Sequence, residues 1–272
     1  MPLAEMAVTV LTTADGREKT AISREFASVW RDARAGGVVP EIGQATPPDR
    51  PSRPEKPTLL SPRDVPMRKP GTPDGRIALL HAVAHIELNA VDLHSDIIAR
   101  FTDTKMPIGF YDDWVQAAVE ESKHFNLMCD CLETAGSFYG ALPAHAGMWR
   151  AAEDTQDDLY GRLAVVPMVL EARGLDVTPG MIKIFQQAKA KDAVAALETI
   201  YAEEVHHVAY GSKWFHYLCG RAEKDPTPFF HTLVRQYFHS DLRPPFNEEK
   251  RAEAGIPPDF YWPLTKDGRP TT

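Results

Sequence analysis

Apolar residues recur every three to four positions over several long stretches of the chain, a spacing typical of amphipathic helices. This pattern predicts long helices at 74–103, 111–135, 156–173 and 191–219, and shorter ones at 20–34, 180–188 and 227–237. Thr72 provides a capping signal for the first long helix, and Gly136 ends the second. We expect a kink at Pro167, a helix end at Gly174 and a turn at 175–179. The pattern therefore predicts an all-α protein.

The ends of the chain follow other patterns. Residues 1–18 are expected to form a short apolar strand or arm, and the helix at 20–34 presents Ile22, Phe26, Val29 and Trp30 on one face. Prolines are dense between residues 40 and 73, which predicts an extended segment across the surface, with a disordered linker as the alternative. The predicted organisation is an N-terminal arm at 1–73, a helical bundle at 74–221, and a C-terminal helix and tail at 222–272 packed on the bundle.

Two copies of the motif Glu-x-x-His lie within the predicted long helices, Glu121 to His124 and Glu204 to His207. Residues three apart on a helix emerge about 60° from each other, so each pair can reach one ion. Glu87 precedes the first motif by 34 residues and Glu171 precedes the second by 33, each on an apolar face. Four carboxylates in one core repel one another, and two divalent cations would neutralise them. The sequence therefore predicts a two-metal site.

The connection between the second and third long helices decides whether these ligands meet. If the third helix started near Gly147 and ran antiparallel to the second, Glu171 and Glu121 would lie at different heights. A crossover at 137–155, helical in part around 149–153, brings them level. One long crossover is a property of ferritin-like four-helix bundles, so ligand count and chain path agree.

Other readings of these residues remain open. A Glu on an apolar stripe is more often an ion-pair partner at a helix edge, and Glu120, Glu203 or His206 would shift the ligand register by one. His94 lies on the face of Glu87 but two turns away, which favours a supporting residue or a core histidine over a ligand. Tyr201 is a candidate for a hydrogen bond to a ligand or for a redox relay, with a packed tyrosine as the plain reading. His81 and His85 face elsewhere and are expected to be structural.

Charge and composition exclude several classes of protein. The net charge of −8 argues against a nucleic-acid partner, because phosphate binding depends on Lys and Arg. No run of 18 apolar residues occurs, and the first residues lack the basic flank of an export signal, so we expect a cytoplasmic protein without a membrane partner. The three cysteines, an odd number, argue against a disulfide framework.

Four stretches carry a resemblance to a known family: HAVAHIELNAVDL, EESKHFNLM, VLEARGLDVTPGM and EEVHHVAYG. Together they resemble an uncharacterised family of bacterial ferritin-like proteins, over about residues 50–250, and are distantly similar to a tRNA hydroxylase of the di-iron type. The resemblance implies a di-metal carboxylate four-helix bundle, with a Pro-rich arm before it. By this resemblance the metal ligands are Glu87, Glu121, His124, Glu171, Glu204 and His207.

These ligands suit two iron ions, with Mn/Fe or Mn/Mn pairs as alternatives. Two reduced irons can supply electrons to O2, so we expect an O2-activating oxidoreductase, an oxygenase or oxidase of a small organic substrate. Its partners would be O2 and that substrate or a reductant. The competing classes are a ferroxidase or a peroxide-removing, manganese-catalase-like protein, and a metal-free helical interaction scaffold. The sequence leaves a homodimer open.

Overall fold

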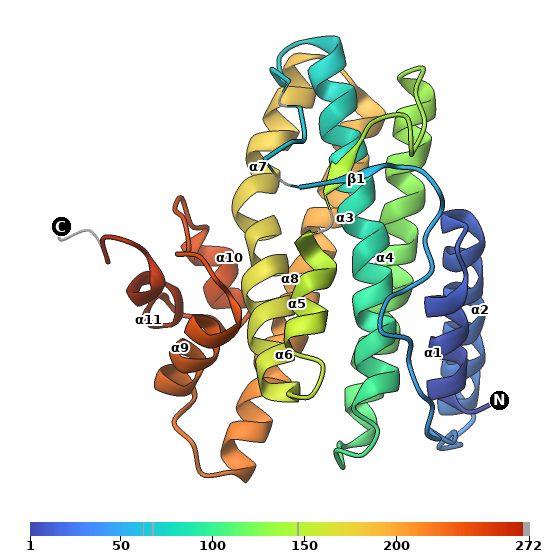
Figure 1. Cartoon of the computed structure of the whole chain (residues 1–272), viewed down its shortest axis with the longest axis vertical. Helices are drawn as coiled ribbons and strands as arrows, with labels where there is room; N and C mark the ends of the chain where they lie inside the picture. Colours follow the sequence, from blue (N-terminus) through green and yellow to red (C-terminus); the bar gives the residue numbers. More distant parts are fainter. Residues whose placement is uncertain (62, 67, 146, 269–272) are drawn as a thin grey trace. The chain divides into compact units, whose positions relative to one another are not determined.

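The computed structural model describes residues 1–61, 63–66, 68–145 and 147–268, most of which lie in helices (Figure 1). The prediction of an all-α protein is therefore confirmed at the level of fold class. Residues 62 and 67 of the predicted Pro-rich arm, residue 146 of the predicted crossover and the last four residues of the predicted tail lie outside the described residues. Within the described ranges, no helix combines the length and the apolar character that crossing a membrane requires.

The chain forms two compact units. Unit 1 consists of residues 1–150 and 182–197, and unit 2 of residues 151–181 together with the chain from Glu198 onward. Three of the described helices, α5 (Gly147–Asp154), α7 (Ala172–Gln187) and α8 (Lys191–Arg221), contribute residues to both units. The division into an arm at 1–73, a bundle at 74–221 and a tail at 222–272 stays a prediction, as does the ferritin-like bundle with one long crossover.

Unit 1 is built around α3 (Pro73–Arg100) and α4 (Ile108–Thr134), which lie side by side (Figure 1). The Thr72 side chain accepts the N–H of Gly75 and begins α3, and Gly136, with a φ of +75°, follows the end of α4, as the sequence predicts. The apolar positions at helical spacing on these two helices are buried: Leu80, Val83, Ala84, Ala90, Val91, Ile98, Trp114, Ala117, Ala118, Phe125 and Met128. The apolar faces of α3 and α4 thus contribute to the core of this unit.

The N-terminal segment is helical, so the strand predicted as one form of residues 1–18 is wrong. α1 (Leu3–Thr12) packs on α3, with Leu3, Ala7, Val10 and Leu11 fully buried. Its β-branched Val and Thr residues favour strands, but the spacing i, i+4, i+7, i+8 places the apolar side chains on one helical face. Burial of that face against a neighbouring helix outweighs the modest propensity of these residues.

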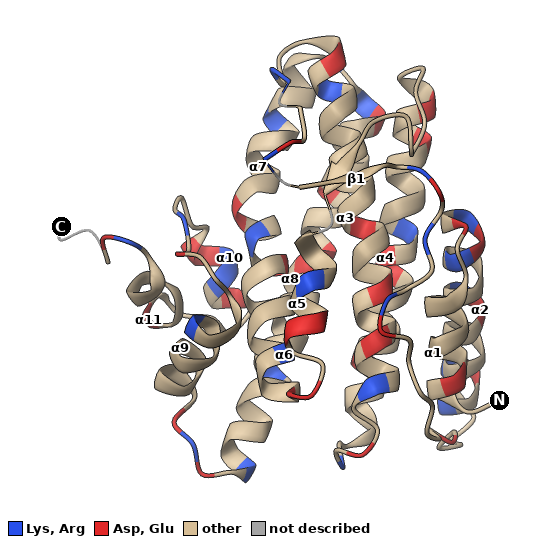
Figure 2. Ribbon diagram, in the orientation of Figure 1, with Lys and Arg blue, Asp and Glu red and all other residues tan. Residues whose placement is uncertain are grey.

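The next helix, α2 (Gly16–Ala35), begins four residues earlier than predicted. The Asp15 side chain accepts the N–H of Glu18 and caps the helix at that point. Phe26 and Trp30 are buried as predicted, whereas Val29 is 54% exposed and does not belong to the buried face. Acidic and basic positions both lie along the length of α2 (Figure 2).

The Pro-rich stretch between α2 and α3 is tied to unit 1 by backbone hydrogen bonds. The N–H of Leu3 donates to the carbonyl of Glu41 at 3.0 Å, and the N–H of Ser52 donates to the carbonyl of Leu11 at 2.8 Å. Further along, β1 (Leu59–Leu60) pairs in parallel with β2 (Ala144–His145). Between these points, residues 42–58 form neither helix nor strand, as expected for a segment dense in proline.

His81 of α3 is a buried neutral histidine in unit 1. The N–H of Gly140 donates to its Nε2 at 2.9 Å, so Nε2 is an acceptor, and the ring stacks on Tyr139. Burial, and to a lesser extent the charge of Arg68, lowers the pKa of His81 to about 4. Protonation of Nε2 would break this hydrogen bond and would place a charge where water cannot solvate it.

We therefore expect the stability of the protein to depend on His81 as the pH falls. In the unfolded chain the imidazole takes up a proton near pH 6.5, whereas the folded protein resists protonation until about pH 4. The contribution of neutral His81 to the free energy of unfolding is fully present above pH 6.5. It is lost as the pH falls from there to about 4, which lowers the free energy of unfolding by roughly 1–2 kcal/mol. Urea unfolding at pH 7 and pH 4.5 measures the loss, and His81→Gln, which keeps an acceptor for Gly140, should lose less. An equal loss in both proteins would contradict this assignment.

Most of the chain that follows the connection from α4 belongs to unit 2. α5 (Gly147–Asp154), which matches the helical part predicted for the crossover, leads into α6 (Leu159–Val165), the π-helix η1 (Val166–Glu171) and α7. The predicted kink at Pro167 is thus a π-helical turn. The C-terminal part contains α9 (Pro226–Tyr237), α10 (Glu248–Glu253), α11 (Pro258–Tyr261) and the 3₁₀ helix η2 (Trp262–Leu264), so α9 is confirmed and the tail contains more helix than predicted.

The helix end predicted at Gly174 and the turn predicted at 175–179 are wrong, because α7 continues through both Gly174 and Pro179 to Gln187. Pro179 has no N–H to donate to the carbonyl of Leu175, four residues earlier. The side-chain Nδ2 of Asn247 donates to that carbonyl instead, at 3.2 Å. The chain turns only after Gln187, and α8 begins at Lys191. This turn lies next to the midpoint between Glu171 and Glu204, as a symmetric helix pair requires.

Gly211 of α8 marks a close approach to Pro167 of η1 within unit 2. A Cβ at position 211 would lie closer to the Pro167 ring than carbon atoms approach in real proteins, and that ring is bonded to the backbone and cannot move aside easily. We expect Gly211→Ala to lower the free energy of unfolding by about 1–3 kcal/mol. Gly220→Ala is the matched control on the same helix, because its added methyl group meets nothing within 4 Å. Urea unfolding compares the two, and equal stabilities would refute the close approach.

Candidate metal centre

The first group of predicted ligands lies in unit 1, where α3 contributes Glu87 and α4 contributes Glu121 and His124. The His124 Nδ1 atom lies 3.3 Å from Oε2 of Glu121 and 3.5 Å from Oε2 of Glu87. One ligand atom from each of the three side chains lies within 4.8 Å of the others. The side chains of Glu121 and His124 are fully buried, and Glu87 is 4% exposed. Two carboxylates and an imidazole from two helices therefore converge in a buried site.

Burial makes this arrangement electrostatically costly for the apoprotein. The pKa of Glu87 is raised well above its usual value, first by burial and then by the neighbouring carboxylate of Glu121, while His124 acts in the opposite direction. A divalent cation among these side chains would remove the repulsion and favour both carboxylates in their charged form. The donor set of carboxylate oxygens and imidazole nitrogen fits iron or manganese.

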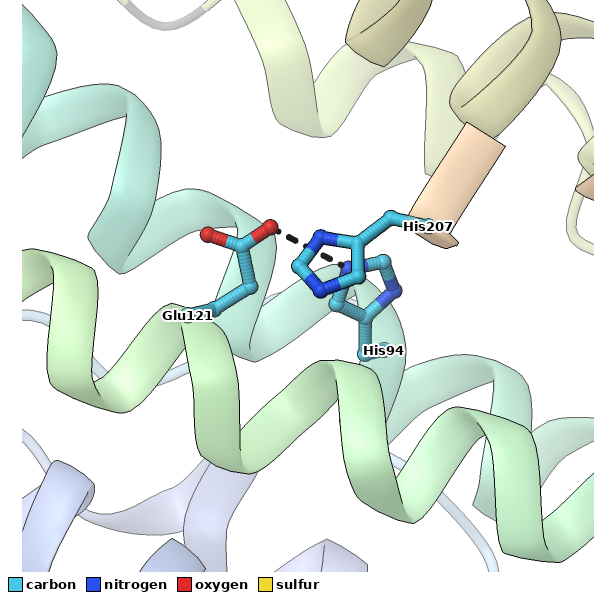
Figure 3. Close-up of side chains that lie close together, drawn as sticks. All are labelled: His94, Glu121 and His207. Carbon is cyan, nitrogen blue, oxygen red and sulfur yellow. Dashed lines mark ion pairs between the residues drawn. The ribbon is translucent and has the colours of Figure 1, made fainter. Parts of the chain in front are cut away.

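His94 lies next to the same site. Its Nε2 atom is 3.6 Å from Oε1 of Glu121, and the two side chains are turned toward each other (Figure 3). The imidazole ring stacks on Trp114, with ring centroids 5.3 Å apart. The sequence favours a supporting or core role, because His94 is two turns from Glu87. Spacing along α3 alone gives no signal for the contact with Glu121, which reaches His94 from the neighbouring helix.

The second group of predicted ligands lies in unit 2 and is also buried. Nδ1 of His207 is 3.7 Å from Oε1 of Glu204, one turn apart on α8, and Glu171 is the last residue of the π-helix η1. π-Helical turns occur frequently at functional sites. Sequence reasoning had left open a shift of register by one residue. Glu203 is half-buried and His206 is exposed, so the side chains directed into the protein are those of Glu204 and His207.

The remaining candidates have local partners. The Tyr201 hydroxyl accepts a hydrogen bond from Nδ2 of Asn247 at 2.7 Å, which joins α8 to the segment before α10. His85 pairs through Nδ1 with the Tyr139 hydroxyl at 2.9 Å and through Nε2 with the carbonyl of His145 at 3.0 Å. These contacts give His85 the structural role that the sequence predicts, and they direct the Tyr201 hydroxyl to the C-terminal segment.

Comparisons with known proteins place the chain in a family without assigning a reaction. The model of a family described as "Protein of unknown function (DUF455)" matches residues 12–262. A protein of Haemophilus influenzae, described as "Uncharacterized protein", is 41% identical over 208 residues, which cover 75% of this chain and 72% of that protein. No solved structure matches the chain.

Proposed function

Because this chain belongs to the DUF455 family, whose function is unknown, we propose a function from its buried side chains: a di-iron or iron–manganese oxidoreductase that activates O2. The substrate would be a small organic molecule. The proposal is supported above all by the buried cluster of Glu87, Glu121 and His124, in which the His124 Nδ1 atom lies within 3.5 Å of both carboxylates.

Six residues would hold the metal pair in this proposal: Glu87, Glu121, His124, Glu171, Glu204 and His207. The set consists of two single glutamates and two Glu-x-x-His motifs, which is the set found in ferritin-like di-iron and di-manganese carboxylate proteins. The four sequence stretches that resemble ferritin-like proteins contain these same residues. A ferritin-like four-helix bundle, distantly similar to that of a di-iron tRNA hydroxylase, is therefore part of the proposal.

The side chains of the site would contribute charge and exclusion of water. A reduced metal pair held there would supply electrons to O2, and the four carboxylates would balance its positive charge. Trp114, which stacks on His94, is fully buried and would keep bulk water from this side of the site. A metal binds the unprotonated nitrogen of an imidazole, so metal binding at His124 would release a proton held on that nitrogen.

The test is to load the purified protein with Fe(II) in the absence of air and then admit O2. We expect about two irons per chain by elemental analysis, the stoichiometry for two-metal carboxylate sites, and O2 uptake on an electrode that requires the bound iron. Protein from metal-replete cells that retains neither iron nor manganese, or loaded protein that takes up no O2, would refute the proposal. Sustained oxidation of added Fe(II) without an organic substrate would assign the site to a ferroxidase instead.

A further inference from the structure

We propose that His94 is a seventh ligand, bound to one of the two metal ions on the Oε1 side of Glu121. This inference rests on the proposed metal site and extends it, because the two Glu-x-x-His motifs do not include His94. It also gives Glu121 a specific task, which is to bridge the two metal positions.

The geometry of Glu121 carries the argument. Its Oε2 atom faces His124, at 3.3 Å from Nδ1, and Oε2 of Glu87 is 3.5 Å from that same nitrogen. Its Oε1 atom faces His94, at 3.6 Å from Nε2. One carboxylate therefore presents each of its two oxygens to a different histidine, as Figure 3 shows for His94. A carboxylate that bridges two cations needs this arrangement, with further donors on each side.

The distance from His94 to Glu121 fits a shared cation better than a direct hydrogen bond. Nitrogen-to-oxygen hydrogen bonds in proteins lie at about 2.7–3.2 Å. The separation of 3.6 Å exceeds this range. Two donors bound to one cation at about 2.0–2.2 Å from it can lie up to about 3.6 Å apart at a tetrahedral angle, so the observed separation is within their reach.

The surroundings of His94 hold its ring in place for such a role. The side chain is buried, and its ring lies on Trp114 with an angle of 26° between the planes. Stacking fixes the orientation of the imidazole and directs Nε2 to Glu121, so little conformational freedom remains to be lost when a metal binds. A third imidazole also makes the two metal positions unequal, because it adds a neutral nitrogen donor to one of them only.

Cobalt provides the test, because bound Co(II) absorbs visible light according to its ligands. We expect wild-type protein to bind two Co(II) ions. The variant His94→Phe keeps a ring to stack on Trp114 but has no donor atom for a metal. We expect it to bind one of the two Co(II) ions about tenfold more weakly, or weaker still, and to show a changed visible spectrum. His94→Gln should do the same. His206→Gln is the control, because His206 is an exposed histidine one residue from a proposed ligand.

Thermal unfolding of the metal-free proteins separates loss of a ligand from loss of the fold. A His94→Phe protein that is as stable as wild type without metal, and that binds both Co(II) ions with the wild-type spectrum, would overturn the inference and leave the six-ligand site intact. Wild-type protein that binds no Co(II), Fe(II) or Mn(II) would overturn the proposed function and this inference together.

Discussion

Replacement of Glu121 by Ala is expected to abolish binding of both metal ions. Glu121 is fully buried and presents one oxygen toward His124 and the other toward His94, so its loss removes a donor from both metal positions. Metal that binds only the folded state raises the unfolding temperature, and this increase should be seen in wild type and be absent from the variant. Elemental analysis and thermal unfolding with and without Fe(II) or Mn(II) measure the two effects.

Without metal, the same variant should not be strongly destabilised. The carboxylate of Glu121 raises the pKa of buried Glu87, so its removal relieves a repulsion, and metal-free Glu121→Ala should retain most of the stability of metal-free wild type. Glu120→Ala is the matched control, since Glu120 is the adjacent, half-buried residue of α4. If Glu121→Ala bound as much metal as Glu120→Ala, the metal centre would be excluded.

Replacement of Lys19 by Met is expected to lower the free energy of unfolding by about 3–5 kcal/mol. Lys19 of α2 is 1% exposed, and its ammonium group pairs with the carboxylate of Asp92 on α3 and donates to the carbonyl of Ser52 at 3.1 Å. Burial raises the pKa of Asp92, and the charge of Lys19 opposes this increase. Without Lys19 the folded protein would hold an uncompensated buried carboxylate. Urea unfolding at pH 7 measures the loss.

A second substitution tests whether the loss comes from the uncompensated charge. The double variant Lys19→Met with Asp92→Leu should recover most of the stability, because apolar residues of similar volume often replace a buried ion pair at little cost. The loss in the single variant should also shrink as the pH falls, since the raised pKa of Asp92 lets it take up a proton in the folded state. Lys183→Met, an exposed lysine of α7, should change stability by less than about 0.5 kcal/mol. Equal effects at Lys19 and Lys183 would contradict the argument.

The helices that carry the candidate site, and the faces they bury, follow from the local amino-acid pattern. Apolar residues at helical spacing give each residue a defined direction around the helix axis, and burial of the widest apolar face is the main stabilising term. For that reason α3, α4 and α8 agree closely with prediction, and Glu87, Glu121, His124, Glu204 and His207 are directed into the protein. What these residues bind, and the ferritin-like bundle they imply, stay predictions.

Other features depend on residues far apart in the chain and emerge only when the helices pack together. Pro179 reads as a helix end, but Asn247 supplies the hydrogen bond that Pro179 cannot donate, and α7 continues. α1 has the composition of a strand, and packing on α3 makes it a helix. Spacing along the chain places His94 too far from Glu87 to share its ligand site, but Glu121 of the neighbouring helix lies next to it. Local pattern fixes the direction of a side chain around its own helix, whereas its partners come from helices whose placement the local pattern does not contain.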